Sequence, residues 1–285
     1  KAHYYDEQTD NYAQHNLQLL VDHEFSNRWK MNIGLHYTKG DGYYQEYKSG
    51  RKLVEYALQP FTVDGSEVKK SDLVRKKAMD NHFGGAVFSL NYKDDRLSAS
   101  LGGAANRYFG KHFGKVLWVK EYIGELTPDH EYYRNNGAKN DANIYLKGDY
   151  RIADGLNLYA DMQYRHIGYK IIGCNDKWNS ATGALQELAI DEKFDFFNPK
   201  AGLSWQIDRS NRLFASVSMA HKEPTRNNYT DGKLDEHPTA ERLMDYEAGY
   251  IYSGRLFTAG ANLYFMDYKD QLVLTGELNE IGEPL

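Results

Sequence analysis

The chain has 285 residues, a formal net charge of −5 and charged side chains at 26 % of its positions. A chain of this length forms one large domain or two ordinary ones, and its acidic balance argues against nucleic acid as a partner. A membrane-spanning helix is excluded, because no apolar stretch approaches the roughly 18–20 residues that it needs. The single cysteine, Cys174, cannot form an internal disulfide, and we interpret it as incidental.

A unit of two alternating segments joined by a short turn recurs along the chain. In the first unit Leu17, Leu19 and Val21 alternate with polar residues, and after a turn at residues 26–28 the alternation continues to Tyr37. Period-two alternation on both sides of a short turn predicts a β-hairpin. Helical periodicity is nearly absent, so the sequence predicts an all-β fold. Four further hairpins are predicted: residues 82–92 with 96–106, 140–152 with 156–166, 197–207 with 212–220, and 242–252 with 255–268.

The connections between these hairpins are far longer than the turns within them. They cover residues 39–81, 107–139, 167–196 and 221–241, and we expect them to be loops. Compact soluble domains seldom contain repeated unstructured connections beyond about 12–15 residues. Short turns on one side and long loops on the other are typical of an antiparallel transmembrane β-barrel, with the turns in the periplasm and the loops outside the cell. The expected strands of roughly 9–13 residues are long enough for a tilted crossing.

One face of the predicted strands contains no charged residue. Arg or Lys facing lipid at the bilayer midplane costs about 2–4 kcal/mol, so a lipid-facing surface should lack them. A soluble β-sandwich also alternates between apolar and polar residues, and alternation by itself leaves both folds open. Members of the uncharged face include Leu17, Leu35, Phe88, Leu101, Leu146, Met162, Leu203, Val217 and Leu263.

Aromatic residues on the same face favour the barrel. They gather near the short turns and again toward the long connections, and two such bands around an apolar zone are the girdles of an outer-membrane barrel. Strands favour aromatic residues in every kind of sheet, which is the alternative explanation. The first band is Phe25, Trp29, Tyr92, Tyr150, Trp205, Tyr252 and Phe257, and the second is Tyr37, Tyr164, Phe197 and Phe265.

The predicted strands do not make a complete barrel. Residues 1–11 are expected to be the end of another loop, and residues 271–275 the start of a further strand. A barrel in hydrocarbon must close, because unpaired backbone edges are not tolerated there. We therefore expect residues 1–285 to be a single partial barrel domain of about ten to eleven strands.

No motif of an enzyme is present. The segment Gly110–Lys115 is superficially similar to a phosphate-binding loop, but its spacing is wrong and Val116 stands where Ser or Thr is required. We expect no catalytic activity, no cofactor and no metal site.

Candidate ligand-binding residues lie in the long connections, since binding residues concentrate on loops above a rigid scaffold. Tyrosine and histidine rings can stack on a bulky ligand, and arginine can bind its anionic groups. The alternative is an ordinary role in loop packing, in surface exposure or in closing the end of a strand. The candidates are Tyr43 and Tyr44 in the first connection, His112, Tyr132, Tyr133 and Arg134 in the second, and Arg226, Tyr229 and Asp231 in the last.

The second half of the chain resembles the TonB-dependent outer-membrane receptors, particularly those of the Bacteroidetes. The likeness is strongest over residues 194–275, in FDFFNPKAGL at 194–203, KEPTR at 222–226, YEAGY at 246–250 and ANLYFMDYKDQ at 261–271. It implies a 22-stranded barrel closed by a plug domain, with transport energy supplied by the partner TonB. Residues 1–285 show no plug domain, no TonB-binding segment and no closing C-terminal strands, and we expect all three to be absent from the chain.

The resemblance implies active import of a scarce bulky ligand across the outer membrane. We expect an iron–siderophore or haem complex, and the expected partners are outer-membrane lipid, the plug domain of the same receptor, TonB and the ligand. Two alternatives stay open: a passive porin-type barrel, or a soluble β-rich domain that binds carbohydrate or acts as an adhesin.

Overall fold

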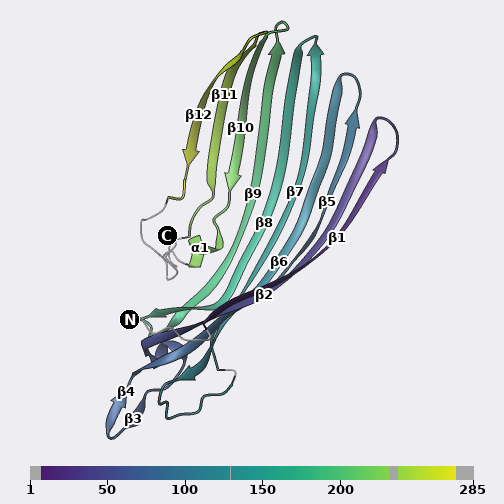
Figure 1. Ribbon diagram of the computed structural model, residues 1–285. Helices are drawn as coiled ribbons and strands as arrows, with labels where there is room; N and C mark the ends of the chain where they lie inside the picture. Colours follow the sequence, from purple (N-terminus) through teal and green to yellow (C-terminus); the bar gives the residue numbers. More distant parts are fainter. Residues whose placement is uncertain (1–7, 129, 231–236, 274–285) are drawn as a thin grey trace.

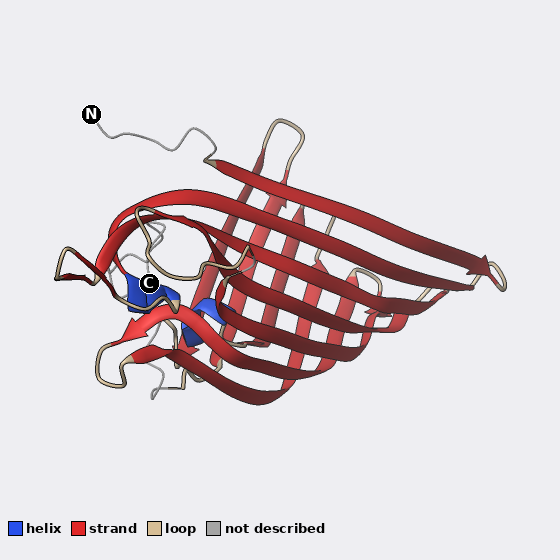
Figure 2. Ribbon diagram, turned by 90° about the horizontal axis from the view of Figure 1, so that it is seen from below, coloured by secondary structure: helices blue, strands red, loops and turns tan. Residues whose placement is uncertain are grey.

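The computed structural model describes residues 8–128, 130–230 and 237–273. Ten strands form one antiparallel sheet, and their order in the sheet follows their order in the chain. The sheet is strongly curved, and Figures 1 and 2 show it as a trough-shaped wall. The strands are β1 (Thr9–Glu24), β2 (Trp29–Lys52), β5 (Lys70–Lys93), β6 (Leu97–Val119), β7 (Glu131–Ala153), β8 (Leu156–Asn179), β9 (Ala184–Gln206), β10 (Asn211–Lys222), β11 (Glu241–Ser253) and β12 (Thr258–Lys269).

Small elements occupy two of the connections. The short helix η1 (Leu53–Tyr56) and the hairpin of β3 (Phe61–Val63) and β4 (Ser66–Val68) lie between β2 and β5. The five-residue helix α1 (Arg226–Thr230) lies between β10 and β11. No helix in the described ranges is both long and apolar enough to span a membrane.

The five predicted hairpins are confirmed, and their turns all lie at one end of the sheet, here called the turn end. Aspartates close two of these turns. Asp94 accepts the backbone N–H groups of Leu97 and Arg96 at 2.7 and 2.8 Å, and these bonds lower the pKa of Asp94 to about 2. Asp208 accepts the N–H of Ser210 at 2.7 Å in the same manner. A side chain that bonds to the backbone two residues on is the ordinary signature of such turns.

The strands extend much further toward the opposite end, the loop end, than the sequence predicts. β2 and the strands β5 to β9 contain 23 or 24 residues each. Most of residues 39–81, 107–139 and 167–196 is therefore paired strand, and the expectation of long loops there is wrong. Beyond the apolar zone polar residues occupy both faces, so the alternation of hydrophobicity fades although backbone pairing continues.

The two outermost strands of the sheet are β1 and β12, which pair only with β2 and β11 among the described strands. The further strand predicted at residues 271–275 is not formed over 271–273, and residues 274–275 lie outside the described residues. A sheet with two open edges is not stable in hydrocarbon, so a closed barrel needs additional strands beside β1 and β12.

The predicted uncharged face is the outer face of the wall. Its cross-strand partners are apolar, as in the pairs Leu19 with Leu35 and Leu101 with Leu146. These side chains are not covered by a second layer: Leu146 is 49 % exposed and Leu203 is 48 % exposed. A continuous apolar surface of this size on a curved antiparallel sheet is a lipid-facing surface.

The aromatic residues bracket this surface. Near the turn end Trp29 packs against Tyr92 with ring centroids 4.9 Å apart. Toward the loop end Tyr246 and Phe265 lie 6.3 Å apart on neighbouring strands, and the Tyr164 hydroxyl donates to Asp195 at 2.6 Å. An aromatic body against lipid with a hydroxyl reaching a charged group is the arrangement expected at a membrane–water interface.

The loop end has a hydrophobic core of its own. The buried residues that form it come from η1, β3, the segment between them and the far ends of β5, β6 and β7, so the strand extensions and the small elements pack as one body. Its buried members are Leu53, Tyr56, Leu58, Phe61, Leu73, Val116, Val119, Tyr132 and Tyr133, and the partly buried Cys174 packs against them.

Charge on the lipid-facing surface provides a test of its role. We expect Leu146→Arg to lower the free energy of unfolding of the complete receptor in lipid vesicles by about 2–4 kcal/mol, because Leu146 lies in the middle of the apolar band. The matched control is Ser216→Arg, which places the same side chain on the inner face opposite Glu247. It should change the free energy of unfolding by less than about 1 kcal/mol. Equal losses in urea titrations of both variants would contradict this assignment of the faces.

Candidate functional site on the inner wall

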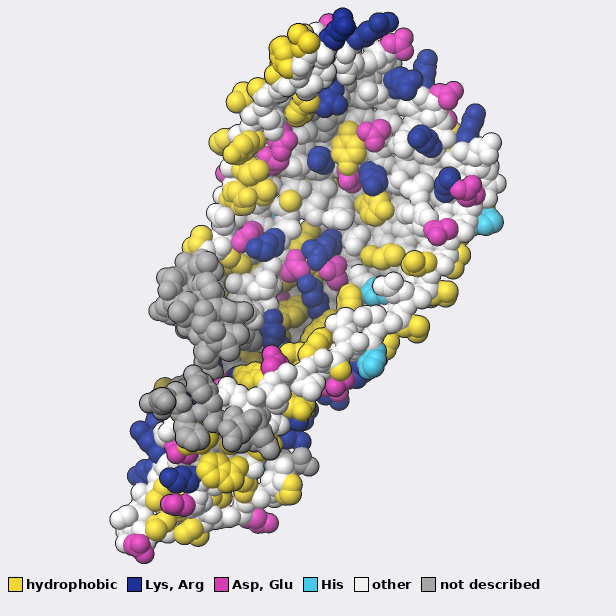
Figure 3. Space-filling view, in the orientation of Figure 1, with side chains coloured by type: hydrophobic (Ala, Val, Ile, Leu, Met, Phe, Trp, Pro, Cys, Tyr) yellow, Lys and Arg dark blue, Asp and Glu magenta, His cyan; other side chains and the backbone are white. Residues whose placement is uncertain are grey.

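The inner face of the wall is polar and hollowed. Figure 3 shows basic and acidic side chains together within this hollow. Two ion-pair clusters and the helix α1 lie on it, on the loop-end side of the apolar band. Because β-strand side chains alternate between faces, each inward group is one residue away from an outward one.

The connection after β10 is fixed to the inner wall by Glu223. Its carboxylate accepts from Lys139 Nζ at 2.6 Å and from Arg165 at 3.1 Å. Arg165 also binds Asp141 with two hydrogen bonds, of 3.0 and 2.5 Å. Glu223 therefore ties the connection to β7 and β8, and charge-assisted bonds of this kind are among the stronger polar contacts.

Helix α1 follows directly from this anchor. The side chain of Asn228 accepts hydrogen bonds from the backbone N–H and the hydroxyl of Thr225, both at 2.7 Å, which closes a turn behind Pro224. Tyr229 is only 4 % exposed, and its ring lies 5.6 Å from that of Tyr169. Pro224 removes a backbone donor where the strand stops, so the chain turns inward and places α1 against the wall.

Arg226 points from α1 to the wall. Its Nη2 donates to Asn135 Oδ1 at 2.5 Å, and Asn135, which is 2 % exposed, donates in turn to the Cys174 carbonyl at 3.0 Å. The guanidinium lies close enough to His112 and Tyr133 to affect their ionisation. Arg226 is therefore the cation around which the inner-wall aromatic groups gather.

His112 lies on β6 opposite Met79 of β5. Burial, and then the positive charge of Arg226, lower the pKa of His112 to about 4. Its Nε2 is buried and has no hydrogen-bond partner among the described residues. At neutral pH the ring is therefore uncharged, and its buried Nε2 is an unsatisfied polar atom.

Tyrosines and an ion cluster lie beyond Arg226 toward the loop end. Burial raises the pKa values of Tyr132 and Tyr133, whose rings are 5.0 Å apart, so both stay protonated. Beside them Arg75 binds Glu46 at 2.7 Å and Asp176 at 3.3 Å. The low exposure of Arg75, 4 %, makes this cluster a rigid part of the wall.

The structure brings together five of the nine predicted ligand-binding residues on the inner wall: Tyr44, His112, Tyr133, Arg226 and Tyr229. Tyr132 and Tyr133 both belong to the loop-end core, and Tyr133 in addition lies near Arg226. Tyr43 and Arg134 face outward, where Tyr43 contacts Lys76 and Arg134 binds Glu131 at 2.6 and 2.5 Å. Asp231 lies outside the described residues. Six of the candidates were expected in loops but lie in the strands β2, β6 and β7, which corrects that expectation. They are Tyr43, Tyr44, His112, Tyr132, Tyr133 and Arg134.

Several inner-wall groups were not predicted from the sequence. Arg75 and Lys77 both bind Asp176, and Tyr169 packs against α1. Arg75 and Lys77 are two residues apart and so share a face, a signal that becomes readable once residues 70–81 are taken as strand. Within the described part of the chain no group of three or more His, Cys, Asp and Glu residues is placed to hold a metal ion.

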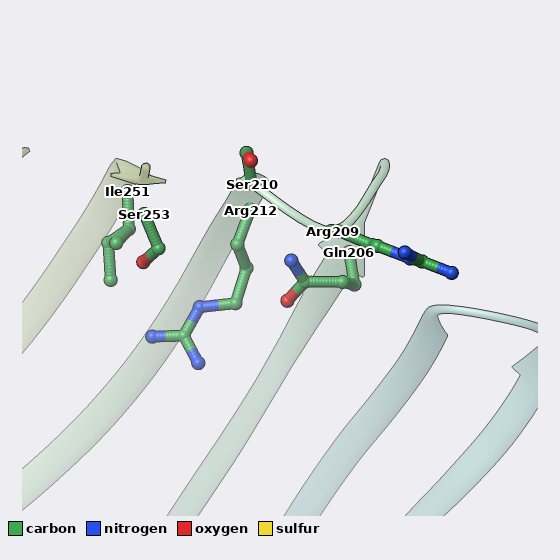
Figure 4. A pocket seen from close by; sticks show the side chains of 6 residues that line it. All are labelled: Gln206, Arg209, Ser210, Arg212, Ile251 and Ser253. Carbon is green, nitrogen blue, oxygen red and sulfur yellow. The ribbon is translucent and has the colours of Figure 1, made fainter. Parts of the chain in front are cut away.

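The wall has two hollows large enough for a small ligand or for side chains of another segment. One, of about 880 Å³, lies at the loop end beside Tyr132, Tyr133 and Trp178. The other, of about 480 Å³, lies on the inner face at the turn end and is lined by residues of β9, β10, β11 and the turn between β9 and β10. Figure 4 shows Gln206 between β9 and β10 and Arg212 between β10 and β11, whereas Arg209 points away.

The match to a known family decides the class of protein. A family model described as "TonB dependent receptor-like, beta-barrel" matches residues 1–283. The chain belongs to this family. Barrels of this family characteristically lie in the outer membrane, with short turns on the periplasmic side and longer loops on the extracellular side. The likeness to the Bacteroidetes members stays a prediction.

Solved structures of TonB-dependent receptors share the fold. The copper transporter OprC superimposes with a TM-score of 0.65 at 11 % identity, over 90 % of this chain and 39 % of OprC. The unliganded ferric citrate transporter FecA gives 0.59 at 11 % identity, over 93 % and 36 % of the two chains. The siderophore receptor PiuA from Acinetobacter baumannii gives 0.57 at 11 %, over 91 % and 40 %. The chain spans about two fifths of these receptors. A comparison with curated protein sequences gives no significant match.

The anchoring role of Glu223 is testable. In the complete receptor, Glu223→Ala should speed amide hydrogen exchange of residues 225–230 by roughly 10- to 100-fold, because Lys139 and Arg165 lose the carboxylate that they share. The control is Asp191→Ala, which breaks the exposed outer pair with Lys170 and should change exchange in α1 by less than about twofold. Unchanged exchange in Glu223→Ala would contradict the anchor.

Acid should loosen the inner wall through His112. The folded-state pKa of about 4 lies below the unfolded value of 6.5, so the unfolded state binds the proton first and stability falls as the pH drops from 6.5 toward 4. The contribution of His112 to this loss is at most about 3 kcal/mol. We expect the Tm of the receptor in detergent to fall less over this range in His112→Gln than in the unchanged protein. Identical pH profiles would show that another group is responsible.

Proposed function

We propose that the chain is a wall segment of an outer-membrane receptor that imports a scarce, bulky iron–siderophore or haem complex with energy from TonB. The observation that carries the proposal is the convergence of Arg226, His112 and Tyr133 on the inner wall, on the loop-end side of the lipid-facing band. Arg226 donates to Asn135, which lies opposite His112 and two residues from Tyr133. Outer-membrane lipid, the plug domain and TonB are the partners that this function requires.

The chemistry of the cluster suits a large ligand with oxygen-rich, partly anionic groups. Arg226 offers N–H donors to carboxylate or catecholate oxygens. The Nε2 of His112 and the hydroxyl of Tyr229 are buried and have no hydrogen-bond partner among the described residues. Buried polar atoms in native proteins are nearly always satisfied, so two unsatisfied atoms near Arg226 favour a further hydrogen-bonding partner in the complete, loaded receptor.

Proteins of similar fold support iron as the cargo. They include a ferric citrate transporter and a siderophore receptor, and also a copper transporter. At 11 % identity they share the fold, so the preference for an iron complex rests on the side chains of the inner wall.

The two alternative functions fit less well. A passive porin needs no TonB, and the family match over residues 1–283 favours a TonB-dependent receptor. A soluble carbohydrate-binding or adhesin domain would cover its apolar face, whereas Leu17 is 71 % exposed and Leu203 is 48 % exposed on the outer face of this sheet.

The plug domain of the same receptor is the proposed occupant of the barrel interior. The 480 Å³ hollow beside Arg212 and Gln206 opens on the inner face at the turn end, where a polar or acidic plug surface would meet hydrogen-bond donors.

Growth on defined iron sources tests the proposed function. A strain lacking the complete receptor should fail to grow on at least one of ferric siderophore, ferric citrate or haem as sole iron source. The same strain should grow normally when iron is plentiful and growth depends on uptake of cobalamin. The combined variant Arg226→Ala with Tyr229→Phe should weaken binding of the iron source so identified by roughly tenfold or more, the loss expected for one charged hydrogen bond. Unchanged growth of the deletion strain on every iron source would contradict iron import.

The matched control is Tyr159→Phe, which removes a hydroxyl from the inner face of β8 near the turn end, where it donates to Asp161. It should leave the affinity within about twofold, because the loss of a hydroxyl outside the proposed contact costs little. Equal affinity in the control and in the combined variant would show that Arg226 and Tyr229 are structural.

A further inference from the structure

Four inward positions follow one another along β7 at two-residue steps, and each adjoins a side chain from outside the strand. In chain order they are Asn135, Gly137, Lys139 and Asp141. The first two adjoin the guanidinium of Arg226, which donates to Asn135 at 2.5 Å. Lys139 donates to Glu223 at 2.6 Å. Because Asn135 and Lys139 are four residues apart, the Arg226 contact lies about 13 Å along the strand from the Glu223 contact.

The wall binds Glu223 as it would bind the carboxylate of a ligand. Nη1 and Nη2 of Arg165 donate to the two oxygens of Glu223, each at 3.1 Å, and Lys139 Nζ donates to Oε1. Two bonds from one planar guanidinium match the plane and the oxygen spacing of a carboxylate. Burial opposes the charge on Glu223, but the bond from Lys139 and the charges of both cations outweigh it and lower the pKa of Glu223. The geometry is therefore that of a carboxylate site.

Charge in this cluster is balanced only while Glu223 takes part. Asp141 also binds Arg165, through Nε and Nη2, and offsets one of the two cations. Glu223 offsets the other. The residues directly opposite Lys139 and Arg165 on the adjacent strands are uncharged: Tyr108, Tyr169, Asn143 and Phe196. Withdrawal of Glu223 therefore leaves one positive charge for another anion.

Glu223 differs from its partners in how the backbone holds it. Lys139 and Arg165 belong to β7 and β8, each paired with a strand on both sides. Glu223 directly follows β10, which ends at Lys222, and belongs to the connection that leads to α1. The side chains of Lys139 and Arg165 are 31 % and 24 % exposed, so both can be reached from the barrel interior. The two cations are fixed in the wall, and the acid is the exchangeable member of the cluster.

We propose that Lys139 and Arg165 form a subsite for a carboxylate group of the cargo, and that Glu223 occupies this subsite until the cargo replaces it. Glu223 is then an autoinhibitory side chain, because an internal competitor lowers the apparent affinity of the ligand. A second carboxylate of the same cargo would bind Arg226, whose contact lies about 13 Å away along β7. The inference rests on the proposed import function and names a polycarboxylate complex as the class of cargo.

Binding of iron-free citrate to the purified complete receptor tests the subsite separately from iron import. Glu223→Gln should strengthen citrate binding by about tenfold or more in calorimetric titrations in detergent, because the competing carboxylate is lost. Addition of Lys139→Gln to this variant should abolish the gain. The matched control is Glu247→Gln, which removes the same charge from the inner face of β11 and should change the citrate affinity by less than about twofold.

Two further arms keep the test decisive. Glu223→Asp retains a carboxylate and should stay within about threefold of the unchanged receptor. In the unchanged receptor, citrate should speed amide hydrogen exchange of residues 225–230, because it takes the cations that anchor this segment. Weaker or equal citrate binding in Glu223→Gln, an equal gain in Glu247→Gln, an equal gain for inorganic phosphate, or slower exchange would each overturn the proposal. Stronger citrate binding together with normal growth of the deletion strain on every iron source would instead contradict iron import and support the subsite.

Discussion

Backbone hydrogen bonding in the absence of water is the constraint on which the rest of this structure depends. Every N–H and C=O group that crosses hydrocarbon must be paired, and a β-sheet achieves this only with neighbours on both sides. Pairing in register then fixes the direction of every side chain. The outer face becomes lipid-facing at Leu101 and Leu146, and the inner face receives the charges of Arg165 and Glu223.

The sequence predicts the part of the fold in which lipid imposes a pattern. The ten strands, five tight turns and two aromatic bands are all readable, because one face must be apolar and the other need not be. Beyond the bands that requirement ends. Residues 39–52 and 70–81 remain paired strands with polar side chains on both faces. They pair because the backbone hydrogen bonds of the membrane-spanning part continue into them in the same register. The local pattern of hydrophobic residues does not indicate this pairing.

The same difference explains the outcome for the inner-wall cluster. Residue type was sufficient to name Arg226, His112 and Tyr133 as candidates, because arginine, histidine and tyrosine side chains can contact an anionic aromatic ligand; their role in binding stays a prediction. Their convergence required the strand register, which sets Asn135 beside Arg226, and the anchor of Glu223 on Lys139. As long as Tyr43 and Tyr44 were assigned to a loop, nothing in the sequence indicated different surroundings for them. In β2 they are adjacent strand residues and face opposite sides of the wall.

Strand extension beyond the membrane also has an evolutionary consequence. Ligand receptors with sites on loops change specificity by lengthening or reshaping those loops. Here successive residues of each long strand face opposite sides of the sheet. Lys76 of β5 contacts Tyr43 on the outer face, and the next residue, Lys77, binds Asp176 on the inner face. Single substitutions can therefore alter the inner or the outer surface separately, without any change of backbone. Adjacent codons in this gene thus encode traits that selection can adjust independently.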